Sequence, residues 1–228
     1  NPGRYRTIPN AGLKPETSET FEGGVRLTSA NISLSITGFT GSYNDFISLE
    51  DVGPASDGIA QYQNVNLGKV RISGAEAQFE ARSRSGLYAN VALSYAKGTV
   101  NPGQSSEAGL LSIDPAKLVM GLGYRDPDRR FGGQLIMTHS AGKSLGSVRA
   151  GSGGATGCSS AAAPTADCIR PDGFTILDAT AFVKLGDRLT LRAGLFNLLD
   201  TKYSWWSDVR PLAATPANLA IIDSYTQP

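Results

Sequence analysis

LYANVALSY, residues 87–95, places Leu87, Ala89, Val91, Leu93 and Tyr95 at alternate positions. Small or polar side chains fill the positions between them, apart from one tyrosine. Successive side chains of a β-strand point to opposite faces, so this period of two predicts a strand with one apolar and one polar face. Helical periodicity is almost absent from the chain.

Seven further segments repeat this alternation along nearly the whole chain. They are residues 21–27, 32–37, 75–80, 118–124, 131–138, 177–184 and 189–195. The sequence therefore predicts about eight strands. Allowing for their ends, such strands reach roughly 9–11 residues or a little more, which is enough for a tilted strand to cross the hydrocarbon layer of a membrane.

The connections between these strands alternate strictly in length. Short polar turns lie near residues 28–31, 82–86, 125–130 and 185–188, and long connections lie near 41–69, 100–113, 141–173 and from 202 onward. Short turns at one end and long loops at the other are typical of a transmembrane β-barrel. We therefore expect an all-β, antiparallel transmembrane β-barrel whose apolar faces meet lipid and whose polar faces line a wet lumen. A soluble β-sandwich, which buries its apolar face in a core, is the alternative.

Eight strands are not expected to be the whole protein. The chain ends in what resembles a long loop, with no returning strand to pair with the first one. An open sheet would leave two unpaired edges in lipid, which is not viable. We expect a longer functional protein of which these residues are a fragment.

Composition narrows the possible functions of the 228 residues. The 21 Lys and Arg and 20 Asp and Glu give a formal net charge of +1, which offers no electrostatic reason for a nucleic-acid partner. One His and two Cys form no cluster at metal-ligand spacing, and no nucleophile-elbow or phosphate-loop motif is present. The sequence therefore predicts neither an enzyme nor a metal site.

Four short motifs are spread over nearly the whole chain. Residues 10–18 read NAGLKPETS, residues 62–76 read YQNVNLGKVRISGAE, residues 196–203 read FNLLDTKY and residues 205–210 read WWSDVR. In this order they resemble the Asn-Pro-Asn-Leu-Lys-Pro-Glu box, the tyrosine-asparagine loop with its Gly-X-Glu strand, the penultimate-strand signature and the Trp-Ser-Asp-Val-Arg stretch of TonB-dependent outer-membrane receptors. The last motif is similar to the haem and haemoglobin receptor branch. The box departs from the family pattern at Ala11 and Gly12, where Pro and Asn are usual.

The resemblance implies an architecture. Family members have a 22-stranded barrel around a plug, and residues 1–228 resemble the C-terminal part of that barrel. The plug domain, the earlier strands and the final strand would lie outside these residues. Such a protein is a multi-pass β-barrel in the outer membrane of a Gram-negative cell, with outer-membrane lipid around it.

The resemblance also implies a function. It predicts a receptor for TonB-dependent uptake of haem, captured free or from haemoglobin, as an iron source. The partners would be haem or haemoglobin and the TonB–ExbB–ExbD complex, reached through the missing N-terminal region. No cofactor would be permanently bound, because haem is the transported ligand. The alternatives are a ferric-siderophore or cobalamin receptor of the same architecture, or a passive porin or adhesin that needs neither plug nor TonB.

Ligand-binding residues are expected in the outer loops. Tyr5 lies just before the box and His139 ends a strand, and both types of side chain can bind haem iron. For His139, the alternative is an exposed histidine at the base of a loop. The box supplies the remaining candidates, which are Asn10, Leu13, Lys14, Pro15 and Glu16.

Two tryptophans near the end of the chain have two possible roles. Trp205 and Trp206 could stack on a porphyrin or contact a globin, because large rigid aromatic side chains suit binding surfaces. They could equally anchor the barrel at the membrane interface, where aromatic girdles mark both edges. Tyr95, Tyr124 and Phe131 fit that interfacial belt better.

The remaining candidates are a disulfide and a set of inward charges. Cys158 and Cys168 lie in one long loop that would mature in an oxidising compartment, which favours a disulfide between them. Charged residues on the polar faces could contact the plug or simply line a solvated wall. These are Glu22, Arg26, Glu76, Glu80, Asp178 and Arg192.

Overall fold

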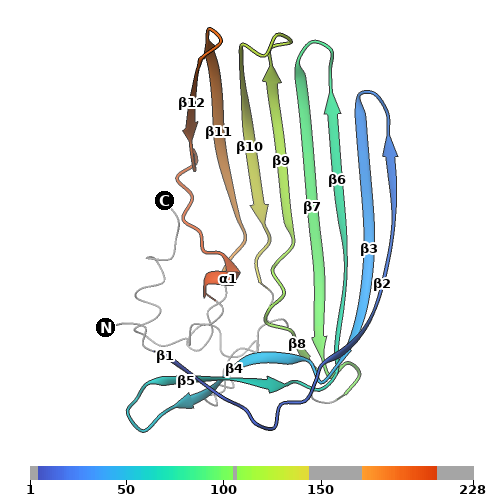
Figure 1. Ribbon diagram of the computed structural model, residues 1–228, viewed down its shortest axis with the longest axis vertical. Helices are drawn as coiled ribbons and strands as arrows, with labels where there is room; N and C mark the ends of the chain where they lie inside the picture. The colour runs from blue at the N-terminus through green and yellow to red at the C-terminus, as the bar shows by residue number, and fades with distance from the viewer. Residues whose placement is uncertain (1–4, 105–106, 144–170, 210–228) are drawn as a thin grey trace.

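The structure, a computed structural model, describes residues 5–104, 107–143 and 171–209, and it consists almost entirely of β-strands (Figure 1). The eight long strands are β2 (Thr17–Thr28), β3 (Ile32–Asn44), β6 (Val70–Arg82), β7 (Leu87–Val100), β9 (Lys117–Arg125), β10 (Phe131–Ser140), β11 (Phe174–Leu185) and β12 (Leu189–Leu195). Each one corresponds to a segment that the alternation predicted.

The long strands form one sheet with the order β12-β11-β10-β9-β7-β6-β3-β2, in which all neighbours pair antiparallel. β2 and β12 are its edges, so the described part is an open wall (Figure 1). The short connections lie together at one end of the wall, here called the turn end, and the long connections lie at the other, the loop end. The predicted all-β, antiparallel architecture is confirmed.

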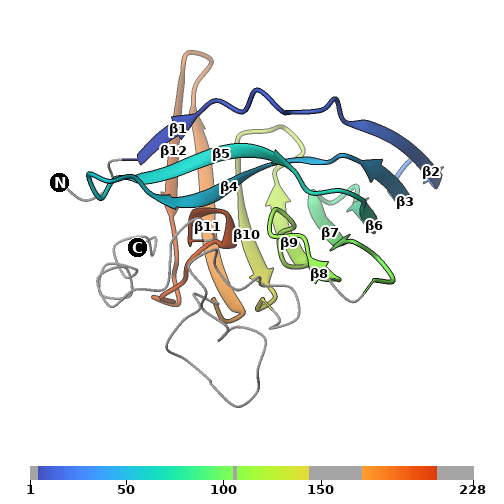
Figure 2. The same ribbon diagram turned by 90° about the horizontal axis from the view of Figure 1, so that it is seen from below.

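A second sheet occupies the loop end, where the sequence predicted only a long connection. β4 (Ile47–Pro54) and β5 (Ala60–Asn66) form a hairpin, and β1 (Tyr5–Ile8) pairs with β5 in parallel. Figure 2 shows this three-stranded sheet passing across the loop end of the wall. β4 escaped the sequence analysis because a register shift between Asp51 and Gly53 breaks its alternation.

Two small elements complete the described structure. β8 (Ala108–Gly109) adds a two-residue pairing to the end of β7, and α1 (Trp206–Val209) is a single helical turn. Among the described residues, no helix is long and apolar enough to span a membrane.

The register separates the wall into two unlike faces. Directly opposed residues of antiparallel strands point to the same side, so Leu34, Phe79, Val91 and Met120 form one row across four strands. We call this side the apolar face. Its large side chains remain uncovered by the chain, as Leu122 shows with 62% exposure. A wall that exposes such a face needs an apolar solvent or a partner to cover it.

The opposite side, here called the polar face, carries all the charges expected to point inward. By register these are Glu22, Arg26, Glu76, Glu80, Asp178 and Arg192. Glycines let the larger polar-face side chains lie flat against the wall. At Gly121, a Cβ would collide with Asn90 and Gln134, whose side chains join across it by a 2.8 Å hydrogen bond.

At the loop end the polar face is not polar. Val70, Val100 and Leu110 are buried there and form the principal apolar cluster of the described residues. Tyr43, Phe46, Leu67, Ile72 and Ile113 pack against it. The expectation of a wet wall along the whole face is therefore wrong at this end, because the connecting segments fold back over it and exclude water.

Candidate ligand-binding site

The box at residues 10–16 links β1 to β2 and is tied to the β4–β5 hairpin. The Asn10 side chain donates to the Asn64 carbonyl at 2.9 Å. Lys14 and Asn66 exchange two hydrogen bonds, because the Lys14 amide donates to Asn66 Oδ1 at 2.9 Å and Asn66 Nδ2 donates to the Lys14 carbonyl at 3.0 Å. The first two sequence motifs therefore meet in space.

A second set of contacts attaches the same segments to the start of the hairpin. Asn66 Nδ2 also donates to the Asp45 carbonyl at 2.7 Å, and the Ile47 amide donates to Glu16 Oε2 at 2.8 Å. Asp45 has φ of 51°, a left-handed conformation that aspartate tolerates better than most residues. We call this network of residues 10–16, 45–47 and 64–66 the clamp.

The clamp divides the box residues into two groups. The side chains of Asn10 and Glu16 form hydrogen bonds with the backbone of the hairpin region, so they position the hairpin. Leu13, Lys14 and Pro15 keep exposed side chains and remain available to a ligand. Sequence reasoning proposed all five as ligand contacts and had no signal for this division, which depends on contacts more than 30 residues apart along the chain.

The hairpin tip is held by an ion pair. Arg6 Nη2 lies 3.0 Å from Asp57 Oδ2, and the Ile59 amide donates to Asp57 Oδ1 at 3.1 Å. The Ile59 N–H, with the Arg6 guanidinium, lowers the pKa of the Asp57 carboxyl below its ordinary value against a smaller opposing effect of desolvation. The pair joins β1 to the tip of the hairpin.

An aromatic cluster lies on the polar face near the loop end. Phe174 of β11 stacks on Tyr203 with ring centroids 4.6 Å apart, and Trp205 packs edge-on against both rings. The Lys117 ammonium lies 4.2 Å from the centre of the Trp205 ring, which suits a cation–π contact. Partial burial, and then the charge of Asp178, raises the pKa of the Tyr203 phenol.

Trp206 is buried, with 3% exposure. Its Nε1 donates to the Leu111 carbonyl at 2.7 Å, and the Lys143 ammonium lies 4.8 Å from the ring centre. A side chain covered in this way is not placed to anchor in lipid, but Trp206 does contribute to the lining of the small pocket described next. Trp205 is only partly buried, and together with Lys117 it borders a small pocket beside Asp114.

His139 lies on the apolar face. Its register partners are Leu118 and Thr175, and its Nδ1 lies 2.9 Å from Thr175 Oγ1. The side chain is exposed near the loop end, which matches the loop-base alternative and points it away from the polar face.

The other candidates are placed as follows. Tyr5 begins β1, where its backbone pairs with Ala60. Tyr95, Tyr124 and Phe131 all lie on the apolar face, as an interfacial belt requires. Cys158 and Cys168 lie outside the described residues. Among those that are described, no three His, Cys, Asp or Glu side chains gather as a metal site.

Residues 1–198 match the family model described as "TonB dependent receptor-like, beta-barrel". The chain belongs to this family of TonB-dependent receptors. Its members are receptors and transporters of the outer membrane.

Known relatives of this receptor segment are named for haemoglobin, haptoglobin or transferrin. The hemoglobin and hemoglobin-haptoglobin-binding protein of Haemophilus ducreyi is 29% identical over 91% of the chain and 24% of its own length. The hemoglobin-haptoglobin utilization protein B of Neisseria meningitidis serogroup C is 25% identical over 89% and 27%. Transferrin-binding protein A of N. meningitidis serogroup B is 25% identical over 93% and 25%. The chain thus spans about a quarter of the length of these relatives.

Solved structures of transporters share the fold. The copper transporter OprC superposes with a TM-score of 0.69 at 20% identity, covering 86% of this chain and 27% of OprC. The FrpB iron transporter of N. meningitidis gives a TM-score of 0.62 at 18% identity, covering 89% and 29%. The open wall therefore has the fold of part of a TonB-dependent barrel.

Sequence reasoning missed Phe174, Tyr203 and Lys117. Phe174 and Tyr203 are separated by a whole hairpin in sequence, and Lys117 begins β9. Tyr203 lies inside the penultimate-strand motif, so its place in a motif was the one available signal. What joins the three side chains is the folding back of residues 196–209 along the polar face, which no local pattern encodes.

Proposed function

We propose that this chain is part of the barrel of an outer-membrane receptor that takes up haem, captured free or from haemoglobin, by TonB-dependent transport. The observation that carries the proposal is the similarity over about nine-tenths of the chain to proteins named for haemoglobin binding. Siderophore and cobalamin transport is the second candidate within the same architecture, and the solved siderophore receptor PirA of Pseudomonas aeruginosa shares the fold.

The loop end suits the capture of a large ligand. The clamp fixes a hairpin across the wall by several hydrogen bonds, so a partner meets a preorganised surface instead of a mobile loop. The exposed box residues Leu13, Lys14 and Pro15 lie at this surface. Trp205 and Lys117 add an aromatic ring and a cation, a combination that fits a planar ligand with acidic groups.

Transport needs parts beyond these residues. The plug and the contact with the TonB–ExbB–ExbD complex belong to the proposed whole protein. The charged polar face would meet the plug, and haem would be the cargo and not a resident cofactor.

The experiment is a haemin titration of the full-length receptor in detergent, followed by the Soret band, together with haemoglobin capture. Saturable binding of either ligand is expected. His139→Ala should leave the Soret band unchanged, because this side chain points away from the polar face, and Tyr5→Phe tests the other iron ligand predicted from the sequence. A receptor that binds neither haemin nor haemoglobin, but binds a ferric siderophore tightly, would contradict the proposal.

A further inference from the structure

A pocket of about 260 Å³ lies on the polar face where β9 begins and β10 ends. Lys117, Trp205 and Asp114 border it, and Ser140 and Ser207 add two more polar side chains. We call it the tryptophan pocket. Pockets that enclose a drug-sized molecule measure about 300–1,000 Å³, so this one has room for only one edge of a porphyrin.

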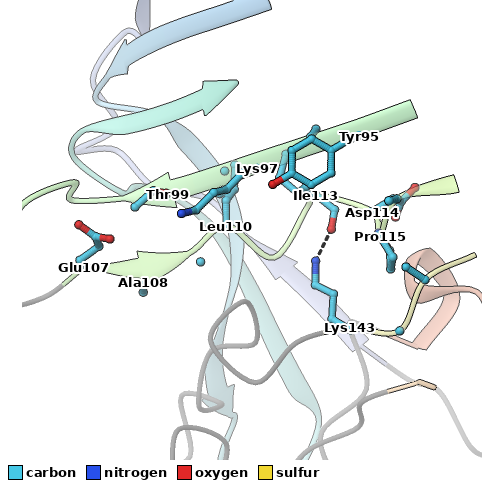
Figure 3. Close-up of a pocket in the computed structure, with 16 residues that line it drawn as sticks. Tyr95, Lys97, Thr99, Glu107, Ala108, Leu110, Ile113, Asp114, Pro115 and Lys143 are labelled. Atoms are coloured by element: carbon cyan, nitrogen blue, oxygen red, sulfur yellow. Dashed lines mark hydrogen bonds between the residues drawn. The ribbon is translucent and has the colours of Figure 1, made fainter. Parts of the chain in front are cut away.

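Hydrogen bonds hold the two sides of the tryptophan pocket together. The ammonium of the buried Lys143 donates to the Ile113 carbonyl, in the connection that leads to β9. Figure 3 shows this bond beside the neighbouring cavity of about 530 Å³. Lys143 also lies 4.8 Å from the centre of the Trp206 ring, and Trp206 donates to the Leu111 carbonyl at 2.7 Å. The connection before β9 is therefore tied to the segment after β12, and the pocket is preorganised before a ligand arrives.

The aromatic cluster fixes the ring of Trp205. Phe174 and Tyr203 contact it edge-on, with ring centroids 4.9 and 5.8 Å from its own. The Lys117 ammonium lies over the same ring, 4.2 Å from its centre, and forms no salt bridge with any residue that the structure describes. A partly buried cation held only by an aromatic ring can bind an anion without giving up an ion pair.

A carboxylate of opposite charge borders the same pocket. Asp114 is exposed, whereas Lys117 is partly buried, so water screens the charge of Asp114 more strongly. The pocket therefore favours an anion beside Lys117, and Asp114 weakens this preference without reversing it. Removal of the cation must then weaken the binding of an anion, and removal of the carboxylate must strengthen it.

We propose that the tryptophan pocket binds the carboxylate-bearing edge of a porphyrin. One propionate accepts a hydrogen bond from the Lys117 ammonium, and the adjoining pyrrole lies against Trp205. Ser140, which is paired with Lys117 across the strands, adds a second donor, because its present hydrogen bond to the Ala141 carbonyl is long at 3.5 Å. The iron stays outside the pocket. This inference rests on the function proposed above and names the part of the cargo that this wall recognises.

The test titrates the full-length receptor in detergent with haemin and with haemin dimethyl ester, followed by the Soret band. The ester keeps the macrocycle and the iron but carries no carboxylate. Because the two probes partition differently into detergent, each variant is compared with wild type for the same probe. K117Q should weaken haemin binding by about tenfold or more, because a charge-assisted hydrogen bond is lost, and should leave ester binding unchanged.

Three further variants separate the parts of the pocket. D114N should tighten haemin binding by about two- to fivefold, because a repulsive charge is removed, without changing ester binding. W205A should weaken the binding of both probes, since both lie against the ring. The matched control K184Q removes a lysine from the polar face at the turn end of β11 and should change neither. Thermal melting of each variant reports whether the barrel has folded.

The outcomes distinguish this inference from the proposed function. A wild-type receptor that binds neither probe would contradict both. Haemin binding that folded K117Q weakens no more than ester binding, or that D114N weakens, would overturn the pocket assignment and leave haem uptake standing.

Discussion

Asn66 should control the stability of the hairpin that crosses the loop end. Its side chain makes three hydrogen bonds in the clamp, two with the Lys14 backbone and one with the Asp45 carbonyl. Asn66→Ala removes all three without adding bulk. The hairpin and the box would then be joined by fewer contacts, chiefly those of Asn10 and Glu16.

The size of the effect follows from the number and exposure of these bonds. A net contribution of about 1 kcal/mol for each bond gives about 3 kcal/mol. Water can replace the protein at the exposed Lys14 backbone, so the expected loss is about 2 kcal/mol. A loss of this size raises the population of the detached hairpin about thirtyfold.

Hydrogen exchange of the backbone amides in residues 47–66 of the full-length receptor measures this population. Asn66→Ala should accelerate exchange in these residues and leave the amides of β9 to β11 unchanged. Asn66→Asp keeps the acceptor for the Lys14 amide and should have an intermediate effect. The control Asn90→Ala removes an asparagine from the wall and should leave the hairpin unaffected. Equal protection of residues 47–66 in wild type and Asn66→Ala would refute the clamp.

Three other changes have defined outcomes. Trp206→Phe should lower the free energy of unfolding by about 1–2 kcal/mol, because the Leu111 carbonyl loses its donor. Trp206→Ala should lower it by about 3–5 kcal/mol, because it also leaves a cavity. Chemical unfolding of the receptor in lipid measures both changes. Gly121→Val should reduce the yield of folded barrel, because the valine side chain would displace Asn90 and Gln134, which lie over this position. Gly23→Ala should fold normally, because there is open space around the new Cβ. A heat-modifiability assay measures the folded yield of both variants. The pKa of Asp57 lies below its ordinary 3.8 because a backbone N–H and an arginine stabilise its charged form. Its stabilising effect is therefore complete above 3.8 and lost as the pH falls through the lowered pKa. The protection of the hairpin-tip amides, expressed relative to their intrinsic exchange rate at each pH, should fall only at such acid pH, and D57N should abolish that dependence.

Much of the fold could be predicted from local patterns. The eight long strands were visible because each alternates apolar and polar residues, and one face of each must meet an apolar environment. The alternating lengths of the connections placed all the turns at one end. The hairpin of β4 and β5 was not visible, because a bulge interrupts its period and its stability depends on the distant box.

The candidate site was predicted less well than the fold. The box was identified as important, but its role in clamping the hairpin emerged only when Asn64 and Asn66 were found beside it. Trp206 was taken as a surface residue because the sequence shows no cover for it. The cover comes from Leu111 and Lys143, which lie more than 60 residues earlier in the chain.

The sequence by itself determined the class of the protein, its strands, the two faces of its wall and its family motifs. These properties depend on the alternation of neighbouring side chains and on short stretches of chain. Only the tertiary structure decided which residues meet at the loop end, where Asn66 joins the box and where Trp205, Lys117 and Phe174 gather. Long connections can close in many ways at little difference in entropic cost, so their arrangement is set by contacts between residues distant in sequence.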